Sequence, residues 1–150
     1  MASFAGMLTA TSPAAPGTGL GTSNVIISKL DEYESLLIVP SLIGATGGTL
    51  DVFIQHSYDE GNNWVDYIHF AQLAAGAAAS KQFVSVSKFG GQVVTFPTVG
   101  YNLTPTLAAA TAVGGPFGSQ MRLIFIAGAG TSAGAAISVS IYAQRSLTFR

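Results

Sequence analysis

The sequence predicts an all-β protein, folded as an antiparallel β-sandwich with an extended N-terminal arm, and a jelly roll is one arrangement that fits. Short runs of apolar and β-branched residues, separated by Gly- and Pro-rich segments, recur from residue 24 onward. The first 23 residues carry no charge, and their Pro and Gly residues oppose regular structure. We therefore expect an extended or flexible arm over 1–23 and a single sandwich domain over 24–150.

The sandwich should contain seven or eight strands. Leu50–His56 alternates in polarity, and a second strand-like segment, Trp64–Phe70, follows after a short connection. These two segments should therefore form a hairpin. Pro40 should end its strand, because proline has no N–H to donate to a central ladder. Met121–Ala127 is almost wholly apolar and should lie in the middle of a sheet. The expected strands are Val25–Ile27, Leu36–Val39, Leu50–His56, Trp64–Phe70, Phe83–Ser87, Val93–Phe96, Met121–Ala127 and Ile137–Tyr142.

Charge is scarce in this chain of 150 residues. Six Lys and Arg and seven Asp and Glu make 9% of the sequence, and the net charge is −1. An average soluble domain carries roughly 25% charged residues. So few basic residues argue against nucleic-acid binding. The absence of cysteine excludes disulfides, thiol nucleophiles and Cys-based zinc sites.

The scarcity of charge also predicts partners. A folded monomer of this mass exposes about 7,000 Å², which gives about one charge per 550 Å² against about one per 190 Å² for an average composition. We interpret this as a surface largely covered by other chains, and a neutral but soluble Ser/Thr/Gly-rich surface is the alternative. No stretch approaches the ~20 strongly apolar residues of a membrane-spanning helix, so no membrane partner is expected. Met1–Ser23 also lacks the basic and apolar regions of a secretory signal.

The most distinctive motif is Ser57-x-Asp59-x-Gly61-x-x-Trp64. Its Asp can accept backbone N–H bonds across a turn, its Gly supplies a positive φ, and its Trp covers the turn with an apolar face. The motif is similar to the Asp-box of sialidases and other propellers, although Asn63 stands where that pattern usually has Thr. A sialidase carries several copies and a cluster of arginines, so we interpret this single copy as a structural turn.

The longer stretch Leu50–Phe70 resembles a hairpin of small virion proteins of tailed bacteriophages, and the capsid decoration (cement) proteins fit best. That resemblance implies a β-sandwich, usually a homotrimer, seated on the major capsid protein with an arm reaching across the shell. It places the protein on the capsid surface of a virion assembled in the host cytoplasm. The large apolar residues of the arm, which are the candidates for capsid contact, are Phe4, Met7 and Leu8.

No catalytic, metal or cofactor site is expected. His56 and His69 are the only imidazoles and fall at different heights of the predicted hairpin, too few for a metal site without further ligands. The acids Asp59, Glu60 and Asp66 match no Ca²⁺ loop, and we expect all three at an exposed turn where nothing raises a pKa. The sequence thus favours a noncatalytic virion protein.

Two alternatives stay open at this point. The first is a structural protein of the phage tail or head–tail junction. The second is a carbohydrate- or ligand-binding β-sandwich module, whose platform would need exposed aromatic residues. The candidates for that platform are Tyr58, Trp64, Tyr67 and Tyr101.

Overall fold

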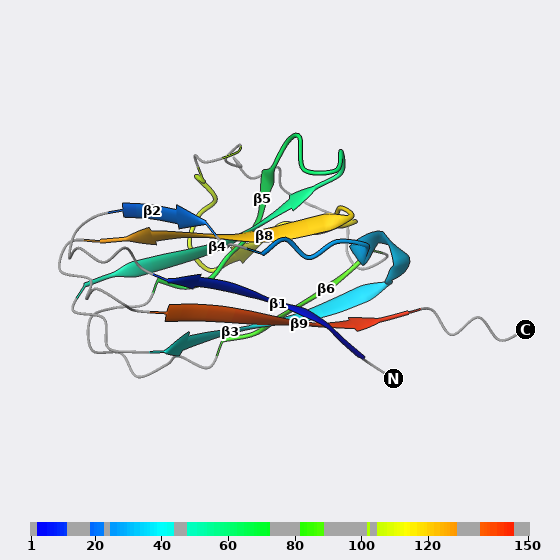
Figure 1. Ribbon diagram of the computed structural model, residues 1–150, viewed down its shortest axis with the longest axis horizontal. Coiled ribbons are helices and arrows are strands. Elements are labelled where there is room, and N and C mark those ends of the chain that lie inside the picture. The colour runs from blue at the N-terminus through cyan, green and yellow to red at the C-terminus, as the bar shows by residue number, and fades with distance from the viewer. Residues whose placement is uncertain are drawn as a thin grey trace, which may run out of the picture.

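The computed structural model is a two-sheet antiparallel β-sandwich, as the sequence predicted (Figure 1). The structure describes residues 3–11, 19–22, 25–43, 48–72, 82–88, 102, 105–128 and 136–145. One sheet has the order β1-β9-β3-β6 and the other β2-β8-β4-β5-β7. The elements are β1 (Ser3–Thr11), β2 (Gly19–Thr22), the 3-10 helix η1 (Leu30–Glu32), β3 (Ser35–Ile43), β4 (Leu50–Ser57), β5 (Val65–His69), β6 (Val84–Ser87), β7 (Thr111–Ala112), β8 (Gln120–Ala127) and β9 (Ala136–Gln144).

The strand order is that of a jelly roll. The first half of the chain pairs antiparallel with the second half: β1 with β9, β2 with β8, β3 with β6 and β4 with β5. This folded-over chain is wound so that β9 also pairs with β3, and β8 with β4. The short β7 adds to the edge of β5. Apart from β7, the two sheets have four strands each and are connected as in an eight-stranded jelly roll.

The main core lies between the two sheets. Along β9 the residues Ile137, Val139, Ile141 and Ala143 are buried, while Ser138, Ser140 and Tyr142 alternate with them on the opposite face. From the other sheet β4 and β8 contribute side chains to the same cluster. The large and fully buried members of this core are Leu8, Leu30, Leu36, Ile38, Leu50, Ile54, Tyr67, Ile68, Met121, Leu123 and Phe125.

Residues 3–11 and 19–22 belong to the sandwich and not to an arm. Residues 3–11 form β1, which pairs along almost the whole of β9, and residues 19–22 form β2 on β8. Leu8 is fully buried in the core. The boundary expected at residue 23 is thus wrong for the described residues, because backbone pairing needs few large side chains. A Cβ on Gly6 would lie 2.8 Å from Ile27 Cδ1, so the small residue here allows close packing.

Other strand predictions have mixed outcomes. The Leu50–Phe70 hairpin is confirmed by the β4–β5 pairing, and β8 lies inside its sheet between β2 and β4. The expected end at Pro40 is wrong, because β3 continues to Ile43. Among the described residues, β3 pairs on both sides only as far as Ile38, and Pro40 lies in the part that pairs with β9 alone, where a proline is more easily accommodated. Val93–Phe96 lies outside the described residues.

The accessible surface of the chain is 8,037 Å². This is larger than the area expected from its mass, so its surface is even sparser in charge than the sequence suggested. Among the described residues, no helix is long and apolar enough to cross a membrane.

Candidate functional site

The Ser57–Trp64 segment forms a closed turn between β4 and β5. Ser57 Oγ donates to Asp59 Oδ1 at 2.7 Å and accepts the Gly61 N–H at 2.9 Å. Asp59 Oδ1 also accepts the Asn63 N–H at 2.8 Å, and Asp59 Oδ2 accepts from the Asn63 side chain at 2.5 Å. Asn63 in place of Thr therefore supplies a second bond to the same carboxylate. These bonds, that from the Asn63 backbone first, lower the pKa of Asp59.

A cation–π contact joins the end of the turn to β8. Trp64 is buried, and the guanidinium carbon of Arg122 lies 4.4 Å from its ring centre. Desolvation by partial burial lowers the pKa of Arg122. Its Nε and Nη2 atoms donate to Gln55 Oε1 at 3.0 and 2.8 Å. The turn therefore serves to close the hairpin and join it to the neighbouring strand.

Asp66 is buried, contrary to the expectation that it lies with Asp59 and Glu60 at an exposed turn. Its Oδ1 accepts from Gln55 Nε2 at 2.8 Å, and its Oδ2 accepts the backbone N–H groups of Thr106 and Leu107 at 2.8 and 3.1 Å. It sits under segment 105–113 and away from Glu60, which is exposed. The two acids therefore do not form a pair, and Asp66 acts as an anchor for that segment.

The two histidines occupy separate environments. His56 is buried and stacks on Tyr67 with ring centres 4.4 Å apart, and its Nδ1 accepts the Gly118 N–H at 3.2 Å. Burial lowers the pKa of His56 to about 4. Among the described residues, no group of three His, Cys, Asp or Glu side chains could hold a metal ion.

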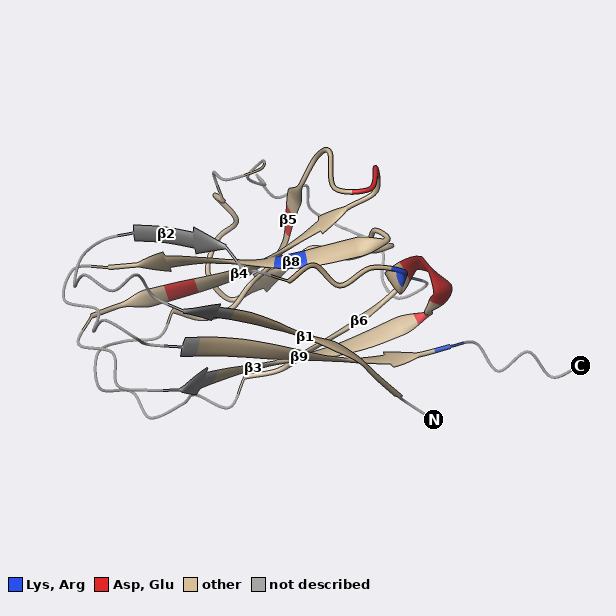
Figure 2. Ribbon diagram, in the orientation of Figure 1, with Lys and Arg blue, Asp and Glu red and all other residues tan. Residues whose placement is uncertain are grey.

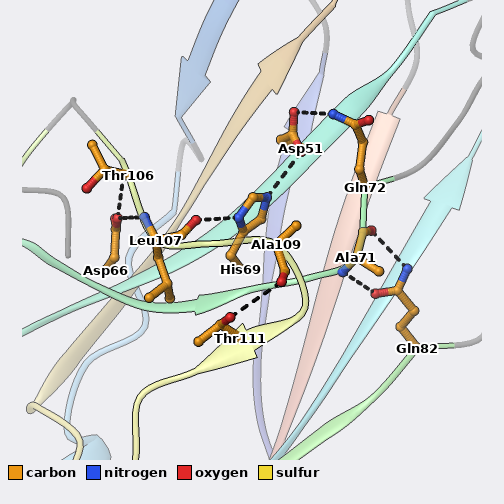
Figure 3. Close-up of polar contacts among 10 residues, drawn as sticks. All are labelled: Asp51, Asp66, His69, Ala71, Gln72, Gln82, Thr106, Leu107, Ala109 and Thr111. Carbon is orange, nitrogen blue, oxygen red and sulfur yellow. Dashed lines mark hydrogen bonds and ion pairs between the residues drawn. The ribbon is translucent and has the colours of Figure 1, made fainter. Parts of the chain in front are cut away.

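His69 stacks on Phe53. Its two ring nitrogens connect β5 to two other parts of the chain (Figure 3). Its Nδ1 lies 2.6 Å from the Leu107 carbonyl oxygen and its Nε2 lies 3.1 Å from Asp51 Oδ1. Gln72 donates to the other oxygen of Asp51 at 2.8 Å. Both ring nitrogens thus face oxygen atoms of other segments, so His69 joins β5 to β4 and to the segment that contains Leu107.

A groove of about 400 Å³ lies beside His69, between β6 and the β5–β7 edge. Its lining is mostly apolar and includes Phe70, Phe83 and Val84. At its rim the side chain of Gln82 makes two hydrogen bonds with the backbone of Ala71, at 2.9 and 3.1 Å (Figure 3). These bonds fix the two ends of segment 71–82 against each other.

Among the four aromatic residues named as a carbohydrate-binding platform, the three that the structure describes do not form one. Trp64 and Tyr67 are buried. Tyr58 is exposed, and its hydroxyl donates to the Pro116 carbonyl. Tyr101 lies outside the described residues.

The β1-β9-β3-β6 sheet has an outer face without charge, which we call the uncharged face. Its four strands contain no Asp, Glu, Lys, Arg or His. In Figure 2, blue and red lie instead on η1 and its flanks, on β4, β5 and β8, at the turn between β4 and β5, and on the segment directly after β9. The outer positions of β9 and β6 are mostly serine, including Ser138, Ser140, Ser85 and Ser87.

Large apolar side chains cross the uncharged face in a row. Tyr142 pairs with Phe4 on one side and with Leu37 on the other. The rings of Phe4 and Tyr142 meet edge to face, 5.7 Å between centres. In the neighbouring row, Met7 on β1 pairs with Ser140 on β9, and Ser140 pairs with Val39 on β3. The exposed fractions are 60% for Phe4, 46% for Met7, 38% for Leu37 and 39% for Tyr142.

The outer face of the other sheet is covered by the chain itself. Leu107 packs there on Phe53 and Ile124 in a second small core, with Val113 and Ile126 beside it. The hydrogen bonds of Asp66 and His69 to Thr106 and Leu107 hold segment 105–113 in place over this face. The protein therefore covers one sheet with its own residues and leaves apolar side chains exposed on the other.

Two of these four residues, Phe4 and Met7, were predicted from the sequence as contact residues together with Leu8, but as parts of an arm and not of a strand. Phe4 and Met7 do lie on an exposed surface, whereas Leu8 points into the core. Leu37 and Tyr142 were missed as surface residues. The signal that could have found them is the absence of charge in four separate strands, but only the strand order shows that those strands share one sheet.

No protein-family model matches the sequence, and no curated protein matches it. Among solved structures, the chain is similar to one from the structure of infectious bursal disease virus Gx strain, with 15% sequence identity and a TM-score of 0.33. The match covers 99% of this chain and 33% of that one, so this chain spans about a third of the length of its structural neighbour.

Proposed function

We propose that this protein is a noncatalytic structural protein of a tailed-bacteriophage virion, which binds the assembled capsid as a decoration protein. The observation that carries the proposal is the uncharged face, where Phe4, Met7, Leu37 and Tyr142 stand exposed on a sheet that contains no charged residue. Exposed apolar patches of this kind on soluble proteins mark contact sites with other proteins.

The resemblance of Leu50–Phe70 to hairpins of phage virion proteins supports the location and names the partner, the major capsid protein. It also supports a homotrimer as the form that binds. The corrected N-terminus changes how the protein would reach the shell. Since residues 3–11 are a strand of the sandwich, contact comes from the folded body and not from an arm over those residues.

The mechanism is linkage between binding and assembly. A protein that binds the assembled shell and not its dissociated subunits stabilises the shell by RT ln(1 + [L]/Kd), about 2.7 kcal/mol for each site at a free concentration of 100 Kd. Such binding needs a large complementary surface and no reactive group. The described polar residues fit this role, since Asp66, His69 and Arg122 are engaged in holding the fold.

The proposal is tested on particles of the phage that encodes the chain. Purified protein is mixed with empty capsid shells and, separately, with unassembled capsid protein, and each mixture is sedimented. Saturable binding to shells alone, with a higher temperature of shell disruption, is expected. Protein that stays in the supernatant contradicts the proposal. Gold-labelled antibody should mark the heads of purified virions, and label confined to tails would favour the tail alternative instead.

A further inference from the structure

One edge of the sandwich carries a groove whose walls are β6 and β7, the last described strands of the two sheets. The hollow of about 400 Å³ beside His69 lies along residues 82–84 of one wall and 110–112 of the other. A second hollow of about 330 Å³ continues it along residues 85–87 and 112–115. Ala112 lines both hollows, which together form what we call the edge groove. Along residues 82–87 the groove is about 20 Å long, the span of a six-residue strand.

The outer edge of β6 offers backbone hydrogen bonds along this groove. β6 pairs with β3, and the Lys88 N–H continues the same ladder by donating to the Glu34 carbonyl at 2.9 Å. In an antiparallel ladder alternate residues bond to the same neighbour, so Val84 and Val86 face β3 as Lys88 does. The N–H and C=O of Ser85 therefore point away from β3, on the side where no described strand pairs with β6. A segment in extended conformation can add to the sheet here.

The lining of the edge groove is apolar and uncharged. Phe83 is 73% exposed, more than any other large apolar residue that the structure describes, and it borders the first hollow together with Val84. Among the described lining residues there is no Asp, Glu, Lys or Arg, and His69 is already in contact with Asp51. A charged side chain buried in the groove would lose its hydration without gaining an ion pair. The groove therefore fits an uncharged segment that brings a large apolar side chain to Phe83.

We infer that the edge groove binds an extended, uncharged peptide segment of another protein, which adds a strand to β6 and packs an apolar side chain against Phe83. Backbone pairing supplies affinity in this mode of binding, and the two hollows select the side chains at alternate positions of the segment. The inference goes beyond the proposed function. Phe4 and Met7 of the uncharged face lie on β1, at the opposite end of the sheet order from β6, so the groove is a second contact site.

The test begins with a displayed library of random octapeptides, selected on the full chain. Selected peptides are synthesised with acetyl and amide ends, and their binding is measured by fluorescence anisotropy. They should lack charge and carry large apolar residues at alternate positions. Phe83→Ser should weaken binding about tenfold or more. Ile26→Ser, at an exposed apolar residue outside the groove, is the control and should change binding by less than about twofold.

A second pair of variants tests the backbone pairing at Ser85. Ser85→Pro removes the N–H that would donate to the peptide, and an edge strand accommodates proline when this N–H points outward. This variant should weaken binding about fivefold or more. Ser85→Ala keeps the N–H and should stay within about twofold of the wild type.

Three results would overturn the inference. The first is a selection that yields no binding peptide or only charged ones. The second is a set of peptides that Phe83→Ser and Ser85→Pro bind as tightly as the wild type does. The third is an oligomer of the chain that the peptide dissociates in light scattering, because a second copy would then be the occupant of the groove. These measurements contain no capsid, so peptide binding and shell binding can fail independently of each other.

Discussion

The side chain of Gln55 donates a hydrogen bond of 2.8 Å to the carboxylate of Asp66, and both side chains are fully buried. Gln55 at the same time accepts from Arg122, so its amide connects a buried anion on β5 to a partly buried cation on β8. A polar network of this kind stabilises the fold only when every member keeps its partner. The first prediction follows from that dependence.

Replacing Asp66 with Asn should destabilise the protein by about 2–4 kcal/mol. The amide has one oxygen where the carboxylate has two, so either Gln55 or the N–H groups of segment 106–107 will face a donor instead of an acceptor. Urea unfolding measures the change. Glu60→Gln, at an exposed acid on the neighbouring turn, is the control and should stay within about 0.5 kcal/mol. Equal stability of the two variants would contradict the anchoring role of Asp66.

The turn between β4 and β5 should be sensitive at Gly61 for two separable reasons. Its φ is +91°, and a Cβ would lie 2.9 Å from Gln120 Oε1. Gly115 has a φ of +98° with open space around its Cβ position. Gly115→Ala should therefore cost about 1 kcal/mol from backbone strain alone, and Gly61→Ala should cost at least as much in thermal unfolding, with only a small addition for moving Gln120 Oε1, the end of a flexible side chain. A larger loss at Gly115 would show that the turn has room for a side chain.

His56 should make stability depend on pH. Its pKa in the folded state is lowered to about 4 from an ordinary value of 6.5, so between these values the unfolded chain binds a proton that the folded protein does not. Stability should therefore fall as pH falls from 6.5 toward 4, by about 3 kcal/mol in all, and should be unaffected by this group above 6.5.

Urea unfolding at pH 7 and pH 4.5 checks this, with His56→Asn as the comparison. The Asn side chain keeps an acceptor near the Gly118 N–H but does not titrate. The variant is expected to be less stable at pH 7 and to lose less stability on acidification. The pKa of Asp59 is also lowered, so protonation of this carboxylate weakens the fold only at a more acidic pH than the range used here. It therefore does not obscure the comparison. If the free energy of unfolding changes equally with pH in the wild type and in His56→Asn, His56 is not the cause of the pH dependence.

The N-terminal strand should contribute to stability through Leu8 and not through its neighbour Met7. Leu8 is fully buried and Met7 is 46% exposed, one position away on the opposite face of β1. Leu8→Ala should cost about 2–5 kcal/mol, whereas Met7→Ala should change the stability of the monomer little. The unfolding temperatures of the two variants, measured at low protein concentration, check this difference. Equal and small effects would restore the view of this segment as an arm.

The sequence by itself determined the features that depend only on residues close together in the chain. Alternation of polarity over Leu50–His56 and Trp64–Phe70 predicted the hairpin, because side chains on a strand alternate between two faces. Positions 57–64 predicted the turn for a similar reason, since the side chains of Ser57 and Asp59 form hydrogen bonds to residues at most four positions apart. Scarcity of charge is a property of composition and needed no structure.

Only the tertiary structure decided what each strand faces. Asp66 reads as a turn residue in the sequence, but it is buried because segment 105–113, forty residues away, folds over it. The small residues of β1 give no strand signal, because their pairing is decided by the free edge of β9. The uncharged face combines four strands that span residues 3 to 144, and the winding of the jelly roll brings them into one sheet. Long-range pairing of this kind leaves no local pattern, since each strand contributes only its own alternation and the partner is chosen by the fold.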